Sequence, residues 1–345
     1  MQVRFRYLER NNFLNKTDLY NLKKFLFSGK YLDNKVQENF EEKVSKYINL
    51  KFCVSVSSGT NAIYLALKSA GIKKNDEVLV PCLSWVSTFT AIEMLGAKAI
   101  GVDIDENFTL NINQLNSRIT NKTKAIIFVH FSGLATNLNL LRKFCNKKKL
   151  ILLEDCAQSF GAKIKGKYTG TFGDYAAFSM NPMKIFSSFG EMGLVSINNN
   201  ANYKKLKILR YAGVKNKEVC INPELNHKAD NLNCFVLTKK LSKLKEIIKK
   251  RILIAEKYNR YLTNKVIKPI FKKDFSHIYY SYIIICNKRN ALKKYLKEKG
   301  IETKIQHKYL ICDHKPFVKN NEKKKFNVGN KLKNRILSLP IDENL

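Results

Sequence analysis

The alternation of short apolar runs with helical segments between Phe52 and Ile197 constrains the fold of this chain more than any other feature. Each run has the length of a buried strand, and the first five are followed by segments that can cross over to the next strand. The predicted strands are Phe52–Val56, Glu77–Val80, Ala99–Val102, Ala125–Val129, Leu150–Leu153, Asp174–Phe178 and Gly193–Ile197. This pattern predicts an α/β fold with a largely parallel sheet, whose ligands bind at the carboxyl ends of the strands.

The flanking segments predict a leading helix and a smaller C-terminal unit. Helical spacing of apolar residues is found in Lys35–Ile48, and a long basic helix is predicted over Val236–Leu262. A strand over Tyr279–Ile285 and a helix over Ala291–Lys299 then indicate an α+β unit. We therefore expect a large domain in residues 1–235, and a linker helix with a small domain in residues 236–345.

Composition excludes several classes of protein. With 45% hydrophobic residues, the chain can bury a sizeable core, so wholesale disorder is excluded, and no apolar stretch is long enough to predict a membrane span. The formal net charge of +35 should attract anions such as nucleotide phosphates or nucleic acid. Because the basic residues are spread along the chain, a solvated basic surface is favoured over a nucleic-acid-binding arm.

Cysteine spacing and the N-terminal segment indicate a reducing compartment. The eight cysteines never form a CxxC pair and most lie in apolar runs, so buried free thiols are favoured over disulfides or a metal site. The segment MQVRFRYLERNNF lacks the continuous apolar region of a secretory signal. We therefore expect a cytoplasmic protein without a bound metal.

The segment SSGTNA, from Ser57 to Ala62, follows a predicted strand and opens a predicted helix. Small and hydroxylated residues at this junction leave backbone N–H groups and the helix dipole available for a phosphate. Ser and Thr are also ordinary helix caps, so this segment alone leaves both interpretations open.

Two acidic residues follow the predicted strand in LILLEDCAQSFGA. Glu154 and Asp155 would point to opposite faces if the chain is still extended there, so one of them can face a ligand. A buried carboxylate needs a partner, and a cationic heterocycle nitrogen would serve. A carboxylate that only caps the following turn is the alternative.

The stretch AAFSMNPMKIFSSFGEMG contains a lysine in apolar surroundings. Lys184 follows Pro182 and lies beside Met183 and Ile185, where burial would make a neutral, nucleophilic amine available. Ser179, one short loop earlier, could donate to the same phosphate as Thr60. In a lysine-rich chain, a plain surface charge is the competing interpretation of Lys184.

Taken together, these segments resemble one enzyme family. The strings SSGTNAIYLAL, VPCLSWVSTFTAI, EDCAQSFGA and GDYAAFSMNPMK, followed by GEMG, occur in the order and spacing of the DegT/DnrJ/EryC1/StrS aminotransferases. The resemblance extends from Ser28 to the end of the chain. It implies the type I fold of pyridoxal-phosphate-dependent aminotransferases, and a transfer of an amino group from glutamate to a nucleotide-linked keto sugar. The family's commonest substrates are 4-keto-6-deoxy hexoses for surface polysaccharides or other glycans.

The resemblance also implies roles for individual residues. Lys184 matches the Schiff-base lysine, Asp155 the carboxylate that keeps the pyridine nitrogen protonated, and Gln158 the residue near the phenolic oxygen. Trp85 matches a ring stacked on the cofactor, with an ordinary core tryptophan as the alternative. The remaining matches are Ser58, Gly59, Thr60 and Ser179 in the phosphate site, and Asn226, which reaches the phosphate of the neighbouring subunit in a homodimer with shared sites.

Some positions depart from the family pattern or leave alternatives open. Met192 replaces a glycine beside the expected sugar pocket, and Lys228 stands where an arginine is common. His130 could border the site or be a satisfied structural histidine, and the other histidines are given no role. The rival functions are a sugar dehydratase of the same family, which has histidine in place of Lys184, a non-catalytic polyanion binder, and a regulatory protein that keeps the fold.

Overall fold

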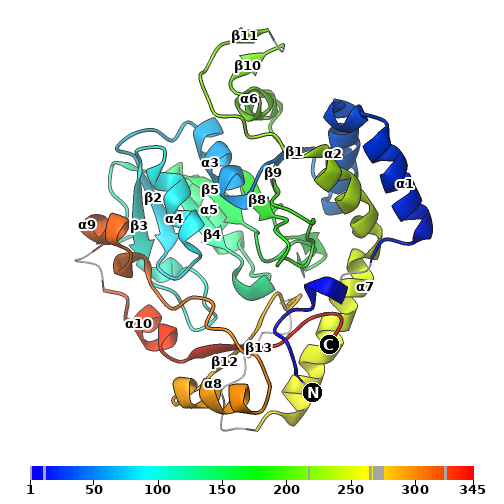
Figure 1. The fold of residues 1–345 in the computed structure, drawn as a ribbon. Helices are drawn as coiled ribbons and strands as arrows, with labels where there is room; N and C mark the ends of the chain where they lie inside the picture. Colours follow the sequence, from blue (N-terminus) through cyan, green and yellow to red (C-terminus); the bar gives the residue numbers. More distant parts are fainter. Residues whose placement is uncertain (1, 11–12, 217, 264–265, 267–275, 322–324) are drawn as a thin grey trace.

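The computed structural model describes residues 2–10, 13–216, 218–263, 266, 276–321 and 325–345. Its centre is a seven-stranded sheet with the order β1-β9-β8-β5-β4-β2-β3 (Figure 1). All neighbouring pairs are parallel except those of β9, which runs antiparallel to both β1 and β8. The strands are β1 (Phe52–Val56), β2 (Glu77–Pro81), β3 (Lys98–Val102), β4 (Thr123–Val129), β5 (Ile151–Asp155), β8 (Tyr175–Ser179) and β9 (Gly193–Ile197). The predicted mostly parallel sheet is confirmed.

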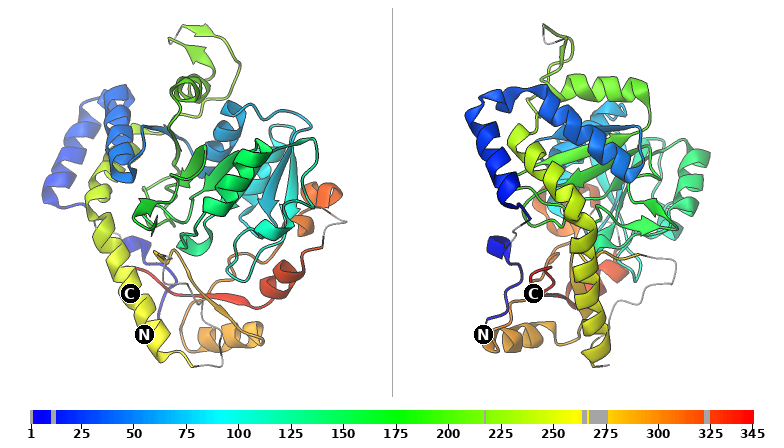
Figure 2. Two further views of the ribbon diagram at one scale, coloured as in Figure 1. Left: turned by 180° about the vertical axis from the view of Figure 1, so that it is seen from behind. Right: turned by 90° about the vertical axis from the view of Figure 1, so that its right-hand side faces the viewer.

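Both faces of the sheet are buried under helices (Figures 1 and 2). Successive residues of β2 show this, because Val78 and Val80 belong to the core beneath α3 and α4, whereas Leu79 belongs to the core beneath α5. The helices around the sheet are α2 (Asn34–Ile48), α3 (Gly59–Ser69), α4 (Val86–Glu93), α5 (Asn139–Lys148) and α6 (Asn200–Arg210). Burial on two faces explains why the strands appear in the sequence as continuous apolar runs.

A long helix, α7 (Asn231–Tyr261), leads from the sheet to a smaller C-terminal unit (Figure 1). It begins five residues before the predicted start. In that unit β12 (Tyr282–Ile285) pairs antiparallel with β13 (Ile336–Leu339), and both strands contribute to a separate apolar cluster. Helix α8 (Arg289–Glu298) packs against β13, and α10 (Asn327–Lys333) precedes it. Helix α9 (Val318–Asn321) lies instead beside β3 of the large sheet (Figure 1).

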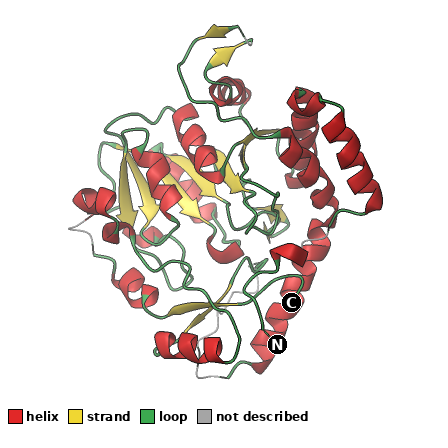
Figure 3. Cartoon of the chain, viewed as in Figure 1, coloured by secondary structure: helices red, strands yellow, loops and turns green. Residues whose placement is uncertain are grey.

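The structure also contains helices and strands that were not predicted from the sequence pattern (Figure 3). They are α1 (Lys16–Phe27) and two short hairpins, β6 (Lys163–Ile164) with β7 (Lys167–Tyr168), and β10 (Val214–Lys215) with β11 (Val219–Cys220). Short 3-10 turns lie at Leu8–Arg10, Lys30–Leu32, Ile112–Gln114, Phe131–Gly133, Ile311–Asp313 and Lys315–Phe317.

The N-terminal segment packs against the C-terminal unit. Val3 forms a parallel bridge with Ile301, and the backbone N–H of Phe5 donates to Glu302 Oε2 at 2.9 Å. The Arg6 guanidinium donates to the carbonyl oxygens of Tyr280 and Ile341. Three segments that are far apart in sequence are thereby held together, and the expected division at residues 235 and 236 stays a prediction.

Two expectations from composition can be compared with the structure. All eight cysteines lie in described segments and are free, and five of them are buried. Among the described residues, no helix combines the length and the apolar character that a membrane crossing requires.

Candidate active site

A cavity of about 470 Å³ opens beside the carboxyl ends of β1, β5 and β8. This is where a largely parallel sheet presents its loops, as the sequence predicted. The predicted site residues that line the cavity are Ser58, Gly59, Thr60, Trp85, Asp155, Gln158, Ser179 and Lys184. Segments separated by more than 100 residues therefore meet at one site.

One end of the cavity is formed by the start of α3. Ser58 is the N-cap, and its side chain accepts a hydrogen bond from the backbone N–H of Asn61. The first N–H groups of a helix have no acceptor within it, so they and the helix dipole favour an anion. A methyl group on Gly59 would lie 2.7 Å from Ser179 Cβ, and one on Gly193 would lie 2.1 Å from the Ser58 carbonyl oxygen. Glycine at both positions lets the loops close around this end.

Asp155 lies at the end of β5 and is 4% exposed. Its carboxylate accepts hydrogen bonds from Thr88 Oγ1 at 3.0 Å and from the Ala157 N–H at 3.1 Å. Burial raises the pKa of this carboxyl, although these two donors and the charge of Lys184 oppose the effect. Because burial dominates, the protein alone does not fully compensate the charge of Asp155.

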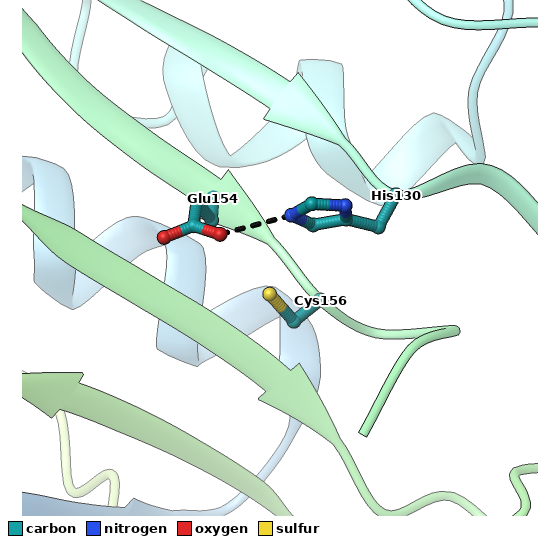
Figure 4. Close-up of side chains that lie close together, drawn as sticks. All are labelled: His130, Glu154 and Cys156. Atoms are coloured by element: carbon teal, nitrogen blue, oxygen red, sulfur yellow. Dashed lines mark hydrogen bonds and ion pairs between the residues drawn. The ribbon is translucent and has the colours of Figure 1, made fainter. Parts of the chain in front are cut away.

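The neighbouring carboxylate, Glu154, is completely buried and points toward His130 (Figure 4). It does not line the cavity that Asp155 enters. Its oxygens lie 2.9 Å from His130 Nε2 and accept hydrogen bonds from the N–H groups of Gly170, Phe172 and Gly173 at 2.7–2.8 Å. Cys156 completes this cluster, whose donor atoms lie within 4.8 Å of one another. Since four groups already occupy the carboxylate, the cluster serves as a structural clamp rather than an open metal site.

The prediction that Glu154 and Asp155 face opposite sides is thus confirmed. His130 does not line the cavity and is fully buried, with Nε2 against Glu154, as a structural histidine would be. It is not a fully satisfied one, because its Nδ1 has no hydrogen-bond partner among the described residues. Asp155 also accepts from the turn that follows the strand, so it combines a position in the cavity with a local cap.

Lys184 is half-buried in the loop after β8. Asn181 shapes this loop, because its carbonyl accepts from the Lys184 N–H and its side-chain oxygen accepts from the Met183 N–H, both at 2.8 Å. Lys184 Nζ lies 4.8 Å from the centroid of the Tyr280 ring. The lysine is therefore a cavity residue, and its interpretation as a plain surface charge is wrong.

The wall opposite the sheet comes from the C-terminal unit and was missed by the sequence analysis. It consists of Tyr280, Lys304, Gln306 and His307. Burial, together with the charges of Lys184 and Lys304, lowers the pKa of His307 to about 4, so its imidazole is neutral near pH 7. Burial acts to raise the pKa of Tyr280, but Lys184, Arg6, Lys304 and Arg251 lower it overall. No local motif in KIQHKYL distinguishes these residues from a surface loop.

Three other predicted positions can be placed. Trp85 is 60% exposed at the start of α4 and lines the cavity, so the alternative of a core tryptophan is wrong. Asn226 is exposed and is not among the cavity-lining residues of its own chain; its side-chain oxygen accepts from the Lys228 N–H at 3.2 Å. Met192 was expected beside the sugar pocket. It does not line the cavity, because it is fully buried in the core.

The amine of Lys184 and the carboxylate of Asp155, whose charge is incompletely compensated, line one cavity that ends at a helix N-terminus. On a two-faced, mostly parallel sheet with a smaller C-terminal unit, this arrangement defines the class of the type I aminotransferases. The family model of the DegT/DnrJ/EryC1/StrS aminotransferases matches residues 13–345, and the chain belongs to this family.

Characterised relatives and solved structures are similar over most of the chain. The dTDP-3-amino-3,4,6-trideoxy-alpha-D-glucose transaminase of Micromonospora megalomicea subsp. nigra is 31% identical over 80% of this chain and 76% of its own length. GDP-perosamine synthase of Escherichia coli O157:H7 is 32% identical over 77% of this chain and 75% of its own length.

Two solved structures extend this similarity to the fold. DesV from S. venezuelae, solved with a ketimine intermediate, has a TM-score of 0.95 and 26% identity, covering 100% of this chain and 94% of its own. NtdA from Bacillus subtilis, solved with bound cofactor PMP, has a TM-score of 0.88 and 26% identity. The match covers 99% of this chain and 81% of NtdA.

Proposed function

We propose that this protein moves an amino group from an amino acid to a nucleotide-linked keto sugar, with pyridoxal phosphate as its cofactor. The observation that carries the proposal is the joint presence of Lys184 and Asp155 in one cavity beside the start of α3. The family membership supports it, since the relatives described above are named as sugar-nucleotide transaminases or synthases.

The chemistry of the cavity fits this cofactor. The start of α3, with Ser58, Gly59 and Thr60, together with Ser179, offers donors for a phosphate. Asp155 is buried without a full counter-charge, which a protonated ring nitrogen would supply. In this proposal Gln158 lies near the phenolic oxygen of the cofactor, and the exposed ring of Trp85 stacks on the pyridine.

The bound cofactor supplies an electron sink for the pair of electrons left when a proton is removed next to nitrogen. The chain provides the remaining parts of the reaction. Lys184 would hold the cofactor covalently, and its Nζ, once freed by a substrate amine, would carry the proton between the reacting carbon of the substrate and the cofactor. Asp155 holds the positive charge of the ring nitrogen in place, because a buried carboxylate without that partner is unfavourable.

The substrates proposed are glutamate as amino donor and a keto sugar carried on a nucleotide, of which a 4-keto-6-deoxy hexose is our first choice. Two half-reactions at one site imply ping-pong kinetics. The net charge of +35 would help to gather a nucleotide diphosphate. Because the two relatives described above act on dTDP- and GDP-linked sugars, a panel of UDP-, GDP- and dTDP-linked keto sugars is the decisive substrate test.

We further propose a cytoplasmic homodimer in which Asn226 reaches the phosphate in the neighbouring subunit. The segment that carries Asn226 is fixed beside the end of β1, since the Ser57 N–H donates to the His227 carbonyl at 2.9 Å. Lys184→Ala and Asn226→Ala chains should each be inactive alone, and mixing them after partial unfolding should restore activity in mixed dimers. Failure of complementation between two folded, dimeric variants would contradict the shared site.

Absorbance separates the proposed function from its rivals. Purified protein with cofactor should be yellow, and glutamate should bleach this colour and yield 2-oxoglutarate. A dehydratase would leave the amino donor unused, and the presence of Lys184 in place of histidine argues against it. A colourless protein that binds DNA in a salt-sensitive manner would instead support a polyanion binder and contradict the proposal.

A further inference from the structure

Tyr280 brings two cations together at the wall of the cavity. Lys184 Nζ lies 4.8 Å from the centroid of its ring, and Arg6 Cζ lies 5.5 Å from the same centroid. Both distances are within the range of a cation–π interaction. The ring is thus in direct contact with the amine that does the chemistry.

The backbone at Tyr280 is fixed by two arginines. Its carbonyl oxygen accepts from the guanidinium of Arg6 and from Arg251 Nη2, the latter at 3.2 Å. Arg251 is 1% exposed on α7 and forms an ion pair of 2.6 Å with Glu343 near the C-terminus. Arg6 comes from a segment that precedes the family match at residue 13. One of the two arginines that hold this backbone carbonyl therefore lies outside the family match, and the other lies within it.

The charges around this contact explain why a holding group is needed. The carboxylate of Asp155, at the end of β5, acts on the charge of Lys184. His307, on the opposite wall, is neutral. Arg6, Lys304 and Arg251 add positive charge on the side of Tyr280. Like charges would push a free, protonated amine away from this wall. The negative face of the aromatic ring offers an attraction that counters this repulsion.

We propose that Tyr280 is a positioning residue for Lys184. The ring of Tyr280 holds the displaced lysine amine in the cavity once that amine has taken up the proton from the substrate. The inference rests on the proposed function, because only a lysine that is displaced and returns needs such a holding group. The ring, rather than the hydroxyl, does the positioning.

The contact itself can be tested without any reaction, in the cofactor-free protein. Tyrosinate absorbance near 295 nm is followed against pH, and the difference between wild type and Tyr280→Phe isolates Tyr280. Its step should come early, because Lys184 and Arg6 lower the pKa of Tyr280, whereas burial raises the pKa of the neighbouring Tyr279. Tyr279→Phe is the matched control and should retain the early step.

Lys184→Met and Arg6→Gln should each move the early step to higher pH by about one unit, as expected for loss of a cation within ~6 Å. An early step that stays in place in Lys184→Met would overturn the contact. Arg6→Gln gives a second reading if one variant does not fold.

Kinetics then test the positioning role. Tyr280→Phe keeps the ring and should retain kcat within about twofold, whereas Tyr280→Leu should lose about tenfold in kcat with KM for both substrates little changed. Equal losses in the two variants would overturn the role of the ring. A wild type that shows the early step and yet transaminates no keto sugar would overturn the proposed function and leave the contact between Tyr280 and Lys184 intact.

Discussion

Replacing Asp155 with asparagine should have opposite effects on stability and on activity. The substitution preserves the size of the side chain and can preserve its contacts. The amide oxygen can accept from the Ala157 N–H, and the amide NH₂ can donate to Thr88 Oγ1, whose own hydroxyl can turn toward Ser84 Oγ at 2.9 Å. What changes is the charge, which burial makes unfavourable.

The magnitude follows from the cost of a buried, incompletely compensated polar group, which is about 1 to 3 kcal/mol in mutational series. We therefore expect cofactor-free Asp155→Asn to be more stable than wild type by about 1 kcal/mol or more, a rise in Tm of about 2 °C. The size of this difference depends on pH. Because the pKa of Asp155 is raised in the folded state, the difference should open as pH rises through its ordinary value of 3.8 and stay constant above the folded value.

The assay is thermal unfolding of both proteins, with and without pyridoxal phosphate, from pH 4 to pH 8, beside steady-state turnover. Bound cofactor should stabilise wild type more than the variant, because only wild type offers a charge partner to the ring nitrogen. Turnover of Asp155→Asn should fall by about 100-fold or more. A cofactor-free variant that is less stable than wild type at pH 7, or one with normal turnover, would refute the reasoning about this carboxylate.

Three further predictions concern other parts of the site. Lys184→Ala should abolish turnover while circular dichroism and Tm stay close to those of wild type; retained turnover would remove this lysine from the reaction. Gly59→Ala should weaken cofactor binding in an equilibrium titration by about tenfold, since its methyl would lie 2.7 Å from Ser179 Cβ, and Gly190→Ala, which meets nothing nearer than 3.5 Å, should bind normally. Glu154→Gln should lower the free energy of unfolding by about 3 kcal/mol in urea, because it unbalances a buried clamp, and a loss below about 1 kcal/mol would contradict that role.

The strands of the large sheet could be predicted because each is buried on both faces and short. The residues at which these strands begin and end were predicted less accurately, and the carboxyl end of β5 matters for the site. The predicted strand Leu150–Leu153 is observed as Ile151–Asp155, so the extended backbone continues through both carboxylates. That extension is the physical reason why Glu154 enters the core clamp and Asp155 enters the cavity.

The C-terminal wall of the site could not be predicted, because its positions are set by contacts between distant segments. The expected strand Tyr279–Ile285 begins only at Tyr282. Tyr279 has a positive φ of 53°, and the carbonyl of Tyr280 accepts from two arginines instead of a neighbouring strand. The sequence near Tyr280 shows a strand-forming run, and only the folded chain reveals that Arg6 and Arg251 interrupt it.

The adjacency of the two carboxylates at the end of β5 makes this strand intolerant of changes in length. Inserting or deleting one residue before Glu154 would exchange the directions of the two side chains, sending the core carboxylate into the cavity and the cavity carboxylate into the core. Point substitutions elsewhere in the strand would leave that order intact. During divergence from its relatives, this chain could therefore vary the composition of β5 far more readily than the number of its residues.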